Sequence, residues 1–313
     1  MTSTRSGAAA LLTALSLLCS MFAPPAAAAP ATVWPPAAVP GIVTAEAPTA
    51  EDFAGRLYVA SLSTDVPEDS RIQLSSSPLS GPAPSWSTRL LVPPSDPNST
   101  IAAKVFGGRL WLAFRAQNQK VYVGSSSDGT SFGGWRSLAG SDEGRGAVSL
   151  KGVGTRLYLA ARDSAGRIRI ASRPSGGDWG AFATVPGLTS PYRPVLTEFR
   201  DRLTVAVTGA DGLVHVRASA NGTSWSALPD APALGPAAAT AGPGLAVWHD
   251  RLWAAARAGG LRLASFDGHT WSPWSTLANP PTRFEPCLTT SSGDLIVATE
   301  GDADQAVLVQ RLR

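Results

Sequence analysis

The chain has 313 residues, with 26 Lys and Arg, 23 Asp and Glu, and a formal net charge of +3. The basic residues are almost all arginines that are scattered singly, so no basic stripe points to nucleic acid or to an acidic membrane surface. The 31 glycines and 26 prolines, together with few helix-like patterns, favour many short strands and turns.

The first predicted element is a signal peptide over residues 1–29. One arginine is followed by an apolar run from Ala8 to about Phe22 and then by small residues, which is the pattern of a secretory leader. The run is too short to span a bilayer stably, and no later stretch is long and apolar enough. We therefore expect cleavage after Ala28 and a secreted protein with one domain over residues 30–313.

Few residues suit a disulfide or a metal site. Without the leader, Cys287 is the only cysteine, so no intramolecular disulfide is possible. We expect Cys287 to be a small buried residue of an inner strand. The histidines His215, His249 and His269 are far apart and lack cysteine or carboxylate neighbours at ligand spacing. The sequence therefore predicts no metal and no cofactor.

A phrase typified by RLYLA recurs six times along the rest of the chain. Its second position is always leucine and its fifth is always alanine. The copies begin at Arg56, Arg109, Arg156, Arg202, Arg251 and Asp294. Each copy is apolar on both faces, which predicts a strand in a sheet that is packed between two other sheets. The alanine lets adjacent sheets approach closely.

A second repeated position is an aromatic residue that follows a turn. Its copies are Trp86, Phe132, Trp179, Trp225 and Trp271, with steps of 46, 47, 46 and 46 residues. Dipeptides such as Asp-Gly and Asn-Gly precede several of them and supply the positive backbone angles of tight hairpins. We expect these aromatic side chains to fill the space between neighbouring sheets.

The length of the repeat predicts the architecture. Four strands in about 47 residues is the arithmetic of a β-propeller blade, and six such units account for residues 30–313. The last unit lacks the strand that follows the turn, whereas the domain begins with such a strand, around Trp34. We therefore predict an all-β, six-bladed propeller of four-stranded antiparallel blades, in which the N-terminal strand completes the last blade and covers an open sheet edge.

The phrases DGTSFGGWRSL, DGHTWSPWSTL and RLYLAARDSAGRIRIASR resemble the repeats of propeller lectins, including Photorhabdus-type lectins and six-bladed fucose-binding fungal lectins. The resemblance implies glycan sites in the clefts between adjacent blades, each formed by an aromatic platform and an arginine. The candidate ligand-binding residues are Arg115, Arg162, Arg257, Trp135 and Trp274.

The chemistry of these side chains suits sugars. The three arginines share the seventh position of the repeat, and a guanidinium offers several donors to sugar hydroxyls, while an indole face packs on the C–H side of a pyranose. The fucose lectins also use a glutamate, and no glutamate recurs in register in this chain. The structural alternative is that the arginines cap strand ends or pair with loop carboxylates.

A competing resemblance is enzymatic. SSDGTSF and SFDGHTW are similar to the Asp-box of sialidases, although both lack the residue between Asp and Gly. Sialidase chemistry requires an arginine cluster, a tyrosine nucleophile activated by a glutamate, and an aspartic acid. Tyr192 is the candidate nucleophile, with Arg193, Glu198 and Glu285 as neighbours, because Arg193 and Glu285 occupy equivalent places in different units.

Three functions follow from these patterns. We expect binding of glycans rather than catalysis, because no recognisable motif assembles the residues of a glycosidase. An exo-glycosidase of the sialidase type is the enzymatic alternative. A non-catalytic propeller that binds protein or peptide at its rim or channel is the third.

Overall fold

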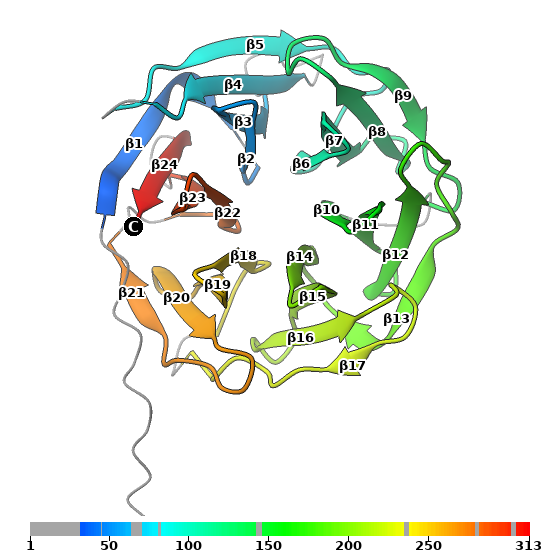
Figure 1. Ribbon diagram of the computed structural model, residues 1–313, viewed down its shortest axis with the longest axis vertical. Coiled ribbons are helices and arrows are strands. Elements are labelled where there is room, and N and C mark those ends of the chain that lie inside the picture. Colours follow the sequence, from blue (N-terminus) through cyan, green and yellow to red (C-terminus); the bar gives the residue numbers. More distant parts are fainter. Residues whose placement is uncertain are drawn as a thin grey trace, which may run out of the picture.

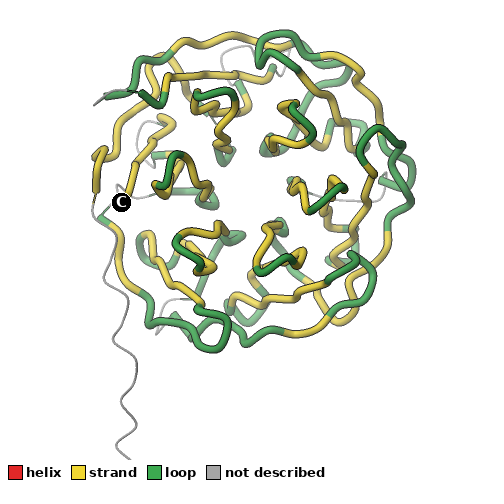
Figure 2. Tube along the Cα trace, in the orientation of Figure 1, coloured by secondary structure: helices red, strands yellow, loops and turns green. Residues whose placement is uncertain are grey.

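The computed structural model describes residues 32–44, 46–63, 71–80, 83–141, 146–234, 238–278, 282–301 and 305–313. The predicted signal peptide over residues 1–29 lies outside these residues. Every regular element in the described part is a β-strand, as Figure 2 shows. In that part, no helix is long and apolar enough to cross a membrane.

The strands form six four-stranded antiparallel sheets that are arranged as blades around a central axis (Figure 1). This confirms the predicted six-bladed propeller. Blade 1 contains β2 (Thr49–Phe53), β3 (Arg56–Leu62), β4 (Ile72–Pro78) and β5 (Ser87–Leu91). Blade 2 contains β6 (Ala102–Phe106), β7 (Arg109–Arg115), β8 (Val121–Ser126) and β9 (Gly133–Ser137). Blade 3 contains β10 (Ser149–Val153), β11 (Arg156–Arg162), β12 (Arg167–Pro174) and β13 (Ala183–Thr189). Blade 4 contains β14 (Val195–Phe199), β15 (Arg202–Thr208), β16 (Val214–Ser219) and β17 (Ser226–Ala227). Blade 5 contains β18 (Gly244–Trp248), β19 (Arg251–Arg257), β20 (Leu261–Phe266) and β21 (Ser275–Leu277). Blade 6 contains β22 (Cys287–Ser291), β23 (Asp294–Glu300), β24 (Ala306–Leu312) and β1 (Thr32–Val43).

The N-terminal strand closes the ring, as predicted. β1 pairs antiparallel with β24, so blade 6 has the order β1-β24-β23-β22. Trp34 lies in this strand, opposite Arg311 in the register. Val39 and Ile42 of β1 are 1% and 2% exposed and belong to the apolar cluster between blade 6 and blade 1. β1 is the outermost strand of its blade, which is where prolines are tolerated in a sheet.

The second strand of each blade carries the RLYLA phrase and is the most buried. The six leucines at its second position and the six alanines at its fifth position are at most 1% exposed. These strands contribute to apolar clusters that each join two neighbouring blades. Packing between blades therefore supplies the core, which explains why the phrase is apolar on both faces.

The repeated aromatic residue lies just before the outermost strand of its blade. All five copies are half-buried and pack against the apolar clusters between blades, which confirms the predicted packing role. The preceding turn also contacts the neighbouring blade. Gly129 has a φ of +71°, and a Cβ at this position would collide with the Tyr58 side chain of blade 1. Tyr58 is itself 5% exposed, as expected for a packing residue.

The turns that resemble Asp-boxes are held by backbone hydrogen bonds. Asp267 Oδ1 accepts hydrogen bonds from the backbone N–H groups of His269 and Thr270, each at 2.8 Å. Hydrogen bonds from Thr270 and His269 lower the pKa of Asp267 to about 2. The carboxylate is therefore charged at neutral pH and serves the turn.

An arginine begins the RLYLA phrase in five blades and reaches across to the third strand. Arg109 Nε, for example, donates to Ser125 Oγ at 2.9 Å, and Arg251 Nε donates to Ser265 Oγ at 3.0 Å. Blade 6 departs from this pattern, because Asp294 occupies the arginine position and Arg311 occupies the serine position, and the two form an ion pair.

Candidate functional site

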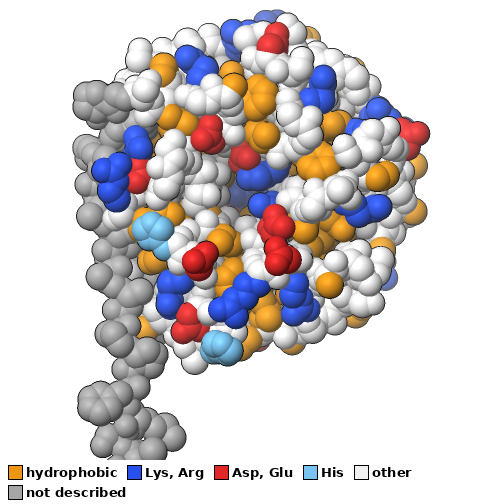
Figure 3. All heavy atoms as spheres, in the orientation of Figure 1, with side chains coloured by type: hydrophobic (Ala, Val, Ile, Leu, Met, Phe, Trp, Pro, Cys, Tyr) orange, Lys and Arg blue, Asp and Glu red, His pale blue; other side chains and the backbone are white. Residues whose placement is uncertain are grey.

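The innermost strands surround a channel along the axis of the ring. We call the face at which each innermost strand begins the connector face, because the connections between blades lie there. A cavity of about 120 Å³ in the channel is lined by all six innermost strands. Figure 3 shows a hollow at the centre of the molecule, with Lys and Arg side chains inside it and Asp and Glu side chains beside it.

Four polar residues from different connections meet at the connector end of the channel. We call Glu46, Thr100, Arg193 and Glu285 the mouth cluster. Each of them precedes an innermost strand by two or three residues. Arg193 Nε lies 2.9 Å from Glu285 Oε1, and the Arg193 side chain is only 7% exposed. Thr100 Oγ1 donates a hydrogen bond to Glu46 Oε2 at 3.3 Å.

The carboxyl group of Glu46 has a raised pKa. Burial, and after it the negative charge of Glu285, raise the pKa of Glu46 to about 7, against the opposing effects of Thr100 and Arg193. Two carboxylates therefore share one cation, Arg193. Near neutral pH, Glu46 exchanges its proton easily, which is a property of acid and base groups in functional sites.

Glu46→Gln is expected to stabilise the protein at high pH and to leave it unchanged at low pH. The raised pKa means that ionised Glu46 destabilises the fold, and this effect begins above the unfolded pKa near 4.5 and is complete above about 7. We expect the variant to gain about 2 kcal/mol in free energy of unfolding at pH 8 and nothing at pH 4. Urea titrations at a series of pH values measure this difference, and a gain that does not vary with pH would contradict the assignment.

The structure brings together two of the four residues that were predicted for a glycosidase. Arg193 and Glu285 form the ion pair of the mouth cluster. Tyr192 is half-buried, and its backbone N–H donates to Ser190 Oγ at 2.9 Å. Glu198 is the fourth residue of β14 and lies 3.9 Å from Lys151, away from the mouth cluster. The predicted catalytic set is therefore split between the two ends of the channel.

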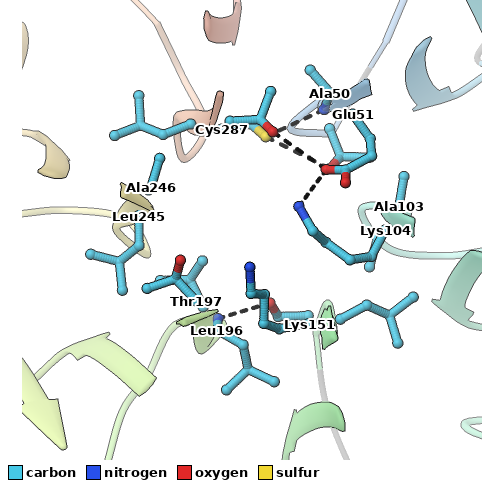
Figure 4. Close-up of a pocket in the computed structure, with 18 of the residues that line it drawn as sticks. Ala50, Glu51, Ala103, Lys104, Lys151, Leu196, Thr197, Leu245, Ala246 and Cys287 are labelled. Carbon is cyan, nitrogen blue, oxygen red and sulfur yellow. Dashed lines mark hydrogen bonds and ion pairs between the residues drawn. The ribbon is translucent and has the colours of Figure 1, made fainter. Parts of the chain in front are cut away.

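Inside the channel, the third residue of each innermost strand lines the cavity. These residues are Glu51, Lys104, Lys151, Thr197, Ala246 and Thr289. Figure 4 shows Lys104 and Lys151 extending into the opening from neighbouring strands. Cys287 lies in β22 and is 9% exposed, as predicted, with its sulfur 3.3 Å from the backbone nitrogen of Ala50.

A second type of site lies between blades. A narrow cleft between blades 2 and 3 is lined by Arg115, Gly140, Ser141, Ala161, Arg162, Asp163, Arg169 and Phe182. The Arg169 guanidinium lies 5.9 Å from the centroid of the Phe182 ring. Arg162 is half-buried at the end of β11. This cleft combines guanidinium groups with an aromatic ring, which are the groups that the lectin resemblance implies.

The other two predicted arginines are held by hydrogen bonds to the protein. Arg115 is 1% exposed and donates to the backbone carbonyls of Gly146, Gln119 and Ser141 at 3.1, 2.6 and 2.7 Å. Arg257 donates to the carbonyl of Thr282 at 2.5 Å and to Thr240 Oγ1 at 2.9 Å. Both side chains fix the connections between blades, which corresponds to the structural alternative.

The two tryptophans that were predicted as sugar platforms are half-buried and pack against apolar clusters between blades. Trp135 is half-buried and lies in the cluster between blades 1 and 2, where its ring covers Gly124 so closely that a Cβ there would lie 2.5 Å away. Trp274 packs between blades 4 and 5, and its Nε1 donates to the carbonyl of Pro232 at 2.7 Å. Neither lines the cleft that contains Arg162, because that cleft lies between blades 2 and 3.

A cleft between blades 3 and 4 was not predicted from the sequence. It has a volume of about 350 Å³ and is lined by residues that include Asp211, His215 and Arg217. His215 lies 3.0 Å from Asp211 and 3.0 Å from Asp230. Burial lowers the pKa of His215, but the two carboxylates more than offset this and raise it above its ordinary value. The imidazole therefore lies between two carboxylates, Asp211 and Asp230.

Comparison with known proteins supports the fold. No family model and no curated protein matches the sequence. Among solved structures, the fungal lectin of Aleuria aurantia, described as a six-bladed β-propeller with a novel fucose recognition mode, is 12% identical with a TM-score of 0.64 and covers 86% of this chain and 92% of that one. The BP39L lectin of Burkholderia pseudomallei is 13% identical with a TM-score of 0.62, over 87% of this chain and 82% of that one.

A sialidase has the same fold over part of its length. The Trypanosoma rangeli sialidase in complex with sialic acid is 12% identical with a TM-score of 0.60 and covers 86% of this chain but 54% of the sialidase. The chain therefore spans about half the length of this enzyme. Together, these likenesses show the fold: the chain is a six-bladed β-propeller that matches lectins, including a fungal fucose-binding lectin, and matches a sialidase over part of the sialidase's length.

Proposed function

We propose that this protein is a secreted carbohydrate-binding propeller whose ligand site is the cleft between blades 2 and 3. The observation that carries the proposal is the presence of Arg162, Arg169 and Phe182 in one cleft. Its structural neighbours include lectins of the same fold, whose names describe fucose recognition in one case. Secretion is proposed from the leader-like segment over residues 1–29.

One residue of the cleft, Asp163, has a structural role. Asp163 is 4% exposed and accepts hydrogen bonds from the backbone of Ala165 and from the backbone and side chain of Arg167, so it holds the hairpin between β11 and β12. Arg162 and Phe182 also line the cleft, and both side chains are half-buried. A sugar ring that enters the cleft would receive hydrogen bonds from the guanidinium and pack on the aromatic ring.

Substitution of Arg162 is expected to weaken glycan binding. Hydrogen bonds to charged groups contribute about 1.5–3 kcal/mol, so Arg162→Ala should reduce affinity tenfold or more on a glycan array. Arg162→Lys should also weaken binding, because a lysine keeps the charge but loses the planar fork of donors. Arg136→Ala is the matched control, since Arg136 is an exposed arginine of β9 that pairs with Asp178 at 2.8 Å.

Two outcomes would overturn this proposal at different levels. A wild-type protein that binds no glycan on the array would reject carbohydrate binding. Glycan binding that is equally strong in wild type and in Arg162→Ala would reject the cleft as the site.

The mouth cluster favours one second candidate, an exo-glycosidase. Glu46, with a pKa near 7, lies in the same cluster as Glu285 and Arg193, and a carboxyl group with such a pKa suits a general acid. Release of a fluorophore from fluorogenic glycosides by the wild-type protein, with loss of release in Glu285→Gln, would support catalysis at the channel mouth. Binding on the array without release supports the lectin.

A further inference from the structure

Charged side chains are unevenly paired in the axial cavity. Glu51 is the most fully paired of them. The Glu51 carboxylate accepts hydrogen bonds from Lys104 Nζ at 2.5 Å, from the backbone N–H of Val105 at 3.2 Å and from Thr289 Oγ1 at 3.3 Å. These three donors come from β6 and β22. Glu51 and Lys104 therefore neutralise one another.

Lys151 faces the same cavity and has a weaker partner. Its ammonium lies 3.9 Å from Glu198, which is an ion-pair distance, and it donates no hydrogen bond within the described residues. Glu198 belongs to the neighbouring strand β14, and its side chain is 34% exposed and so is partly solvated. The positive charge of Lys151 is thus the one that the channel walls compensate least.

The energetics of Lys151 agree with this geometry. Burial, and after it the positive charge of Lys104, lower the pKa of Lys151 to about 8, while Glu198 and Glu51 act in the opposite direction. A negative charge placed between the two ammonium groups would relieve both effects. The positive charge of Lys151 therefore favours binding of an anion in the cavity.

We propose that the axial cavity binds a small hydroxylated monocarboxylate, with its carboxylate between the ammonium groups of Lys104 and Lys151. The proposal is independent of the cleft between blades 2 and 3. One monoanion matches the single cation that the channel walls leave poorly compensated. A cavity of about 120 Å³ holds several water molecules, so the ligand, or the part of it that enters, has only a few non-hydrogen atoms.

The rest of the cavity determines what accompanies the carboxylate. Thr197 supplies a hydroxyl group to the cavity wall, and Figure 4 shows its oxygen on the same side of the opening as Lys151. Ala246 of β18 lies across the ring from Lys104 and gives that wall an apolar surface. A carboxylate that carries a hydroxyl and a short carbon chain would satisfy all three kinds of wall.

Calorimetric titration with lactate tests the proposal, and lactamide serves as the neutral analogue. We expect wild type to bind lactate and not lactamide, and Lys151→Met to bind lactate at least about tenfold more weakly. Lys120→Met is the matched control, because Lys120 is an exposed lysine outside the channel, and it should bind lactate as wild type does. Lys151→Met is preferred to a Lys104 variant, since it removes a half-buried cation without depriving Glu51 of its partner.

Acidity provides a second measurement. Lys151 carries its charge below its pKa, and lactate carries its charge above the ordinary pKa of a carboxyl group, about 4. Lactate affinity should therefore be constant between about pH 5 and 7 and should fall as the pH rises through about 8. Three results would each overturn the proposal. They are no lactate binding by wild type, equal lactate binding by wild type and Lys151→Met, and lactamide binding as tight as lactate binding. Tighter binding of inorganic phosphate than of lactate would overturn the assignment of a carboxylate. Thermal unfolding of each variant separates loss of binding from loss of fold.

Discussion

Ile42→Asp is expected to destabilise the protein by about 4 kcal/mol, because it places a charged carboxylate in the apolar cluster between blades 6 and 1. Ile42 is 2% exposed and lies in β1, the strand that completes blade 6. Loss of β1 from the sheet would expose the edge of β24 and open the ring. Urea unfolding measures the effect as a lower midpoint, and size-exclusion chromatography measures association through the exposed edge.

Ala38→Asp is the control for this experiment. Ala38 lies in the same strand and pairs with Leu308, but its side chain is exposed. The same aspartate should therefore change the free energy of unfolding by no more than about 0.5 kcal/mol. Equal midpoints for Ile42→Asp and wild type would show that β1 does not contribute to the stability of the ring.

Asp294→Ala is expected to have an effect of similar size. Asp294 is 1% exposed and pairs with Arg311, which is 8% exposed, and with Arg313 Nε at 3.0 Å. Removal of the carboxylate deprives the buried Arg311 guanidinium of its counter-charge, which costs about 3–5 kcal/mol in comparable buried pairs. Chemical unfolding at neutral pH measures this loss.

The dependence of stability on pH, and a double variant that replaces Asp294 and Arg311, provide two further tests. Burial raises the pKa of Asp294, but hydrogen bonds from Arg313 and Arg311 outweigh it and lower the pKa overall. The pair therefore stabilises the fold above the ordinary pKa of aspartate and ceases to do so as the pH falls through the lowered value. Asp294→Arg combined with Arg311→Ser recreates the pair of the other blades and should recover most of the stability. A double variant as unstable as Asp294→Ala would contradict this equivalence.

Arg313→Ala provides the surface comparison. Arg313 contacts the same carboxylate, but its side chain is 66% exposed. Solvent screens such a pair, so the expected change is below about 1 kcal/mol. The contrast between Arg311 and Arg313 isolates the effect of burial.

Most of the fold could be predicted from the sequence because the repeat is dictated by packing. Leu157 and Ala160 recur in every copy since each blade meets its neighbours through the same strand. The closing strand was also predictable, because the last unit lacks one strand and the region around Trp34 supplies it. The number of blades follows from length alone once the period is known.

The candidate sites were less predictable, because they depend on which repeat positions meet at the axis or in a cleft. Arg193 and Glu285 were predicted to be near one another from their equivalent places in two repeats, and the structure pairs them. Lys104 and Lys151 are also equivalent, since each lies five residues before the RLYLA phrase of its own unit, and this register could have revealed them. Glu46 carries no such signal.

Trp135 shows why side-chain type alone is insufficient. An aromatic residue after a turn suits both a sugar platform and a packing role, and the sequence does not say what lies beneath the ring. Gly124, on the neighbouring strand β8, provides the flat surface that the Trp135 ring covers. Because Gly124 has no side chain, the Trp135 ring can pack directly on β8.

The pairing of β1 with β24 also determines when the molecule can become complete. The strand that finishes blade 6 is made early by the ribosome, whereas its partner, Ala306–Leu312, is made near the end of the described chain. The first five blades have all of their strands before that moment, but the circle stays open. The ring can therefore close only after β24 has been synthesised, so closure is a late event in the folding of this domain.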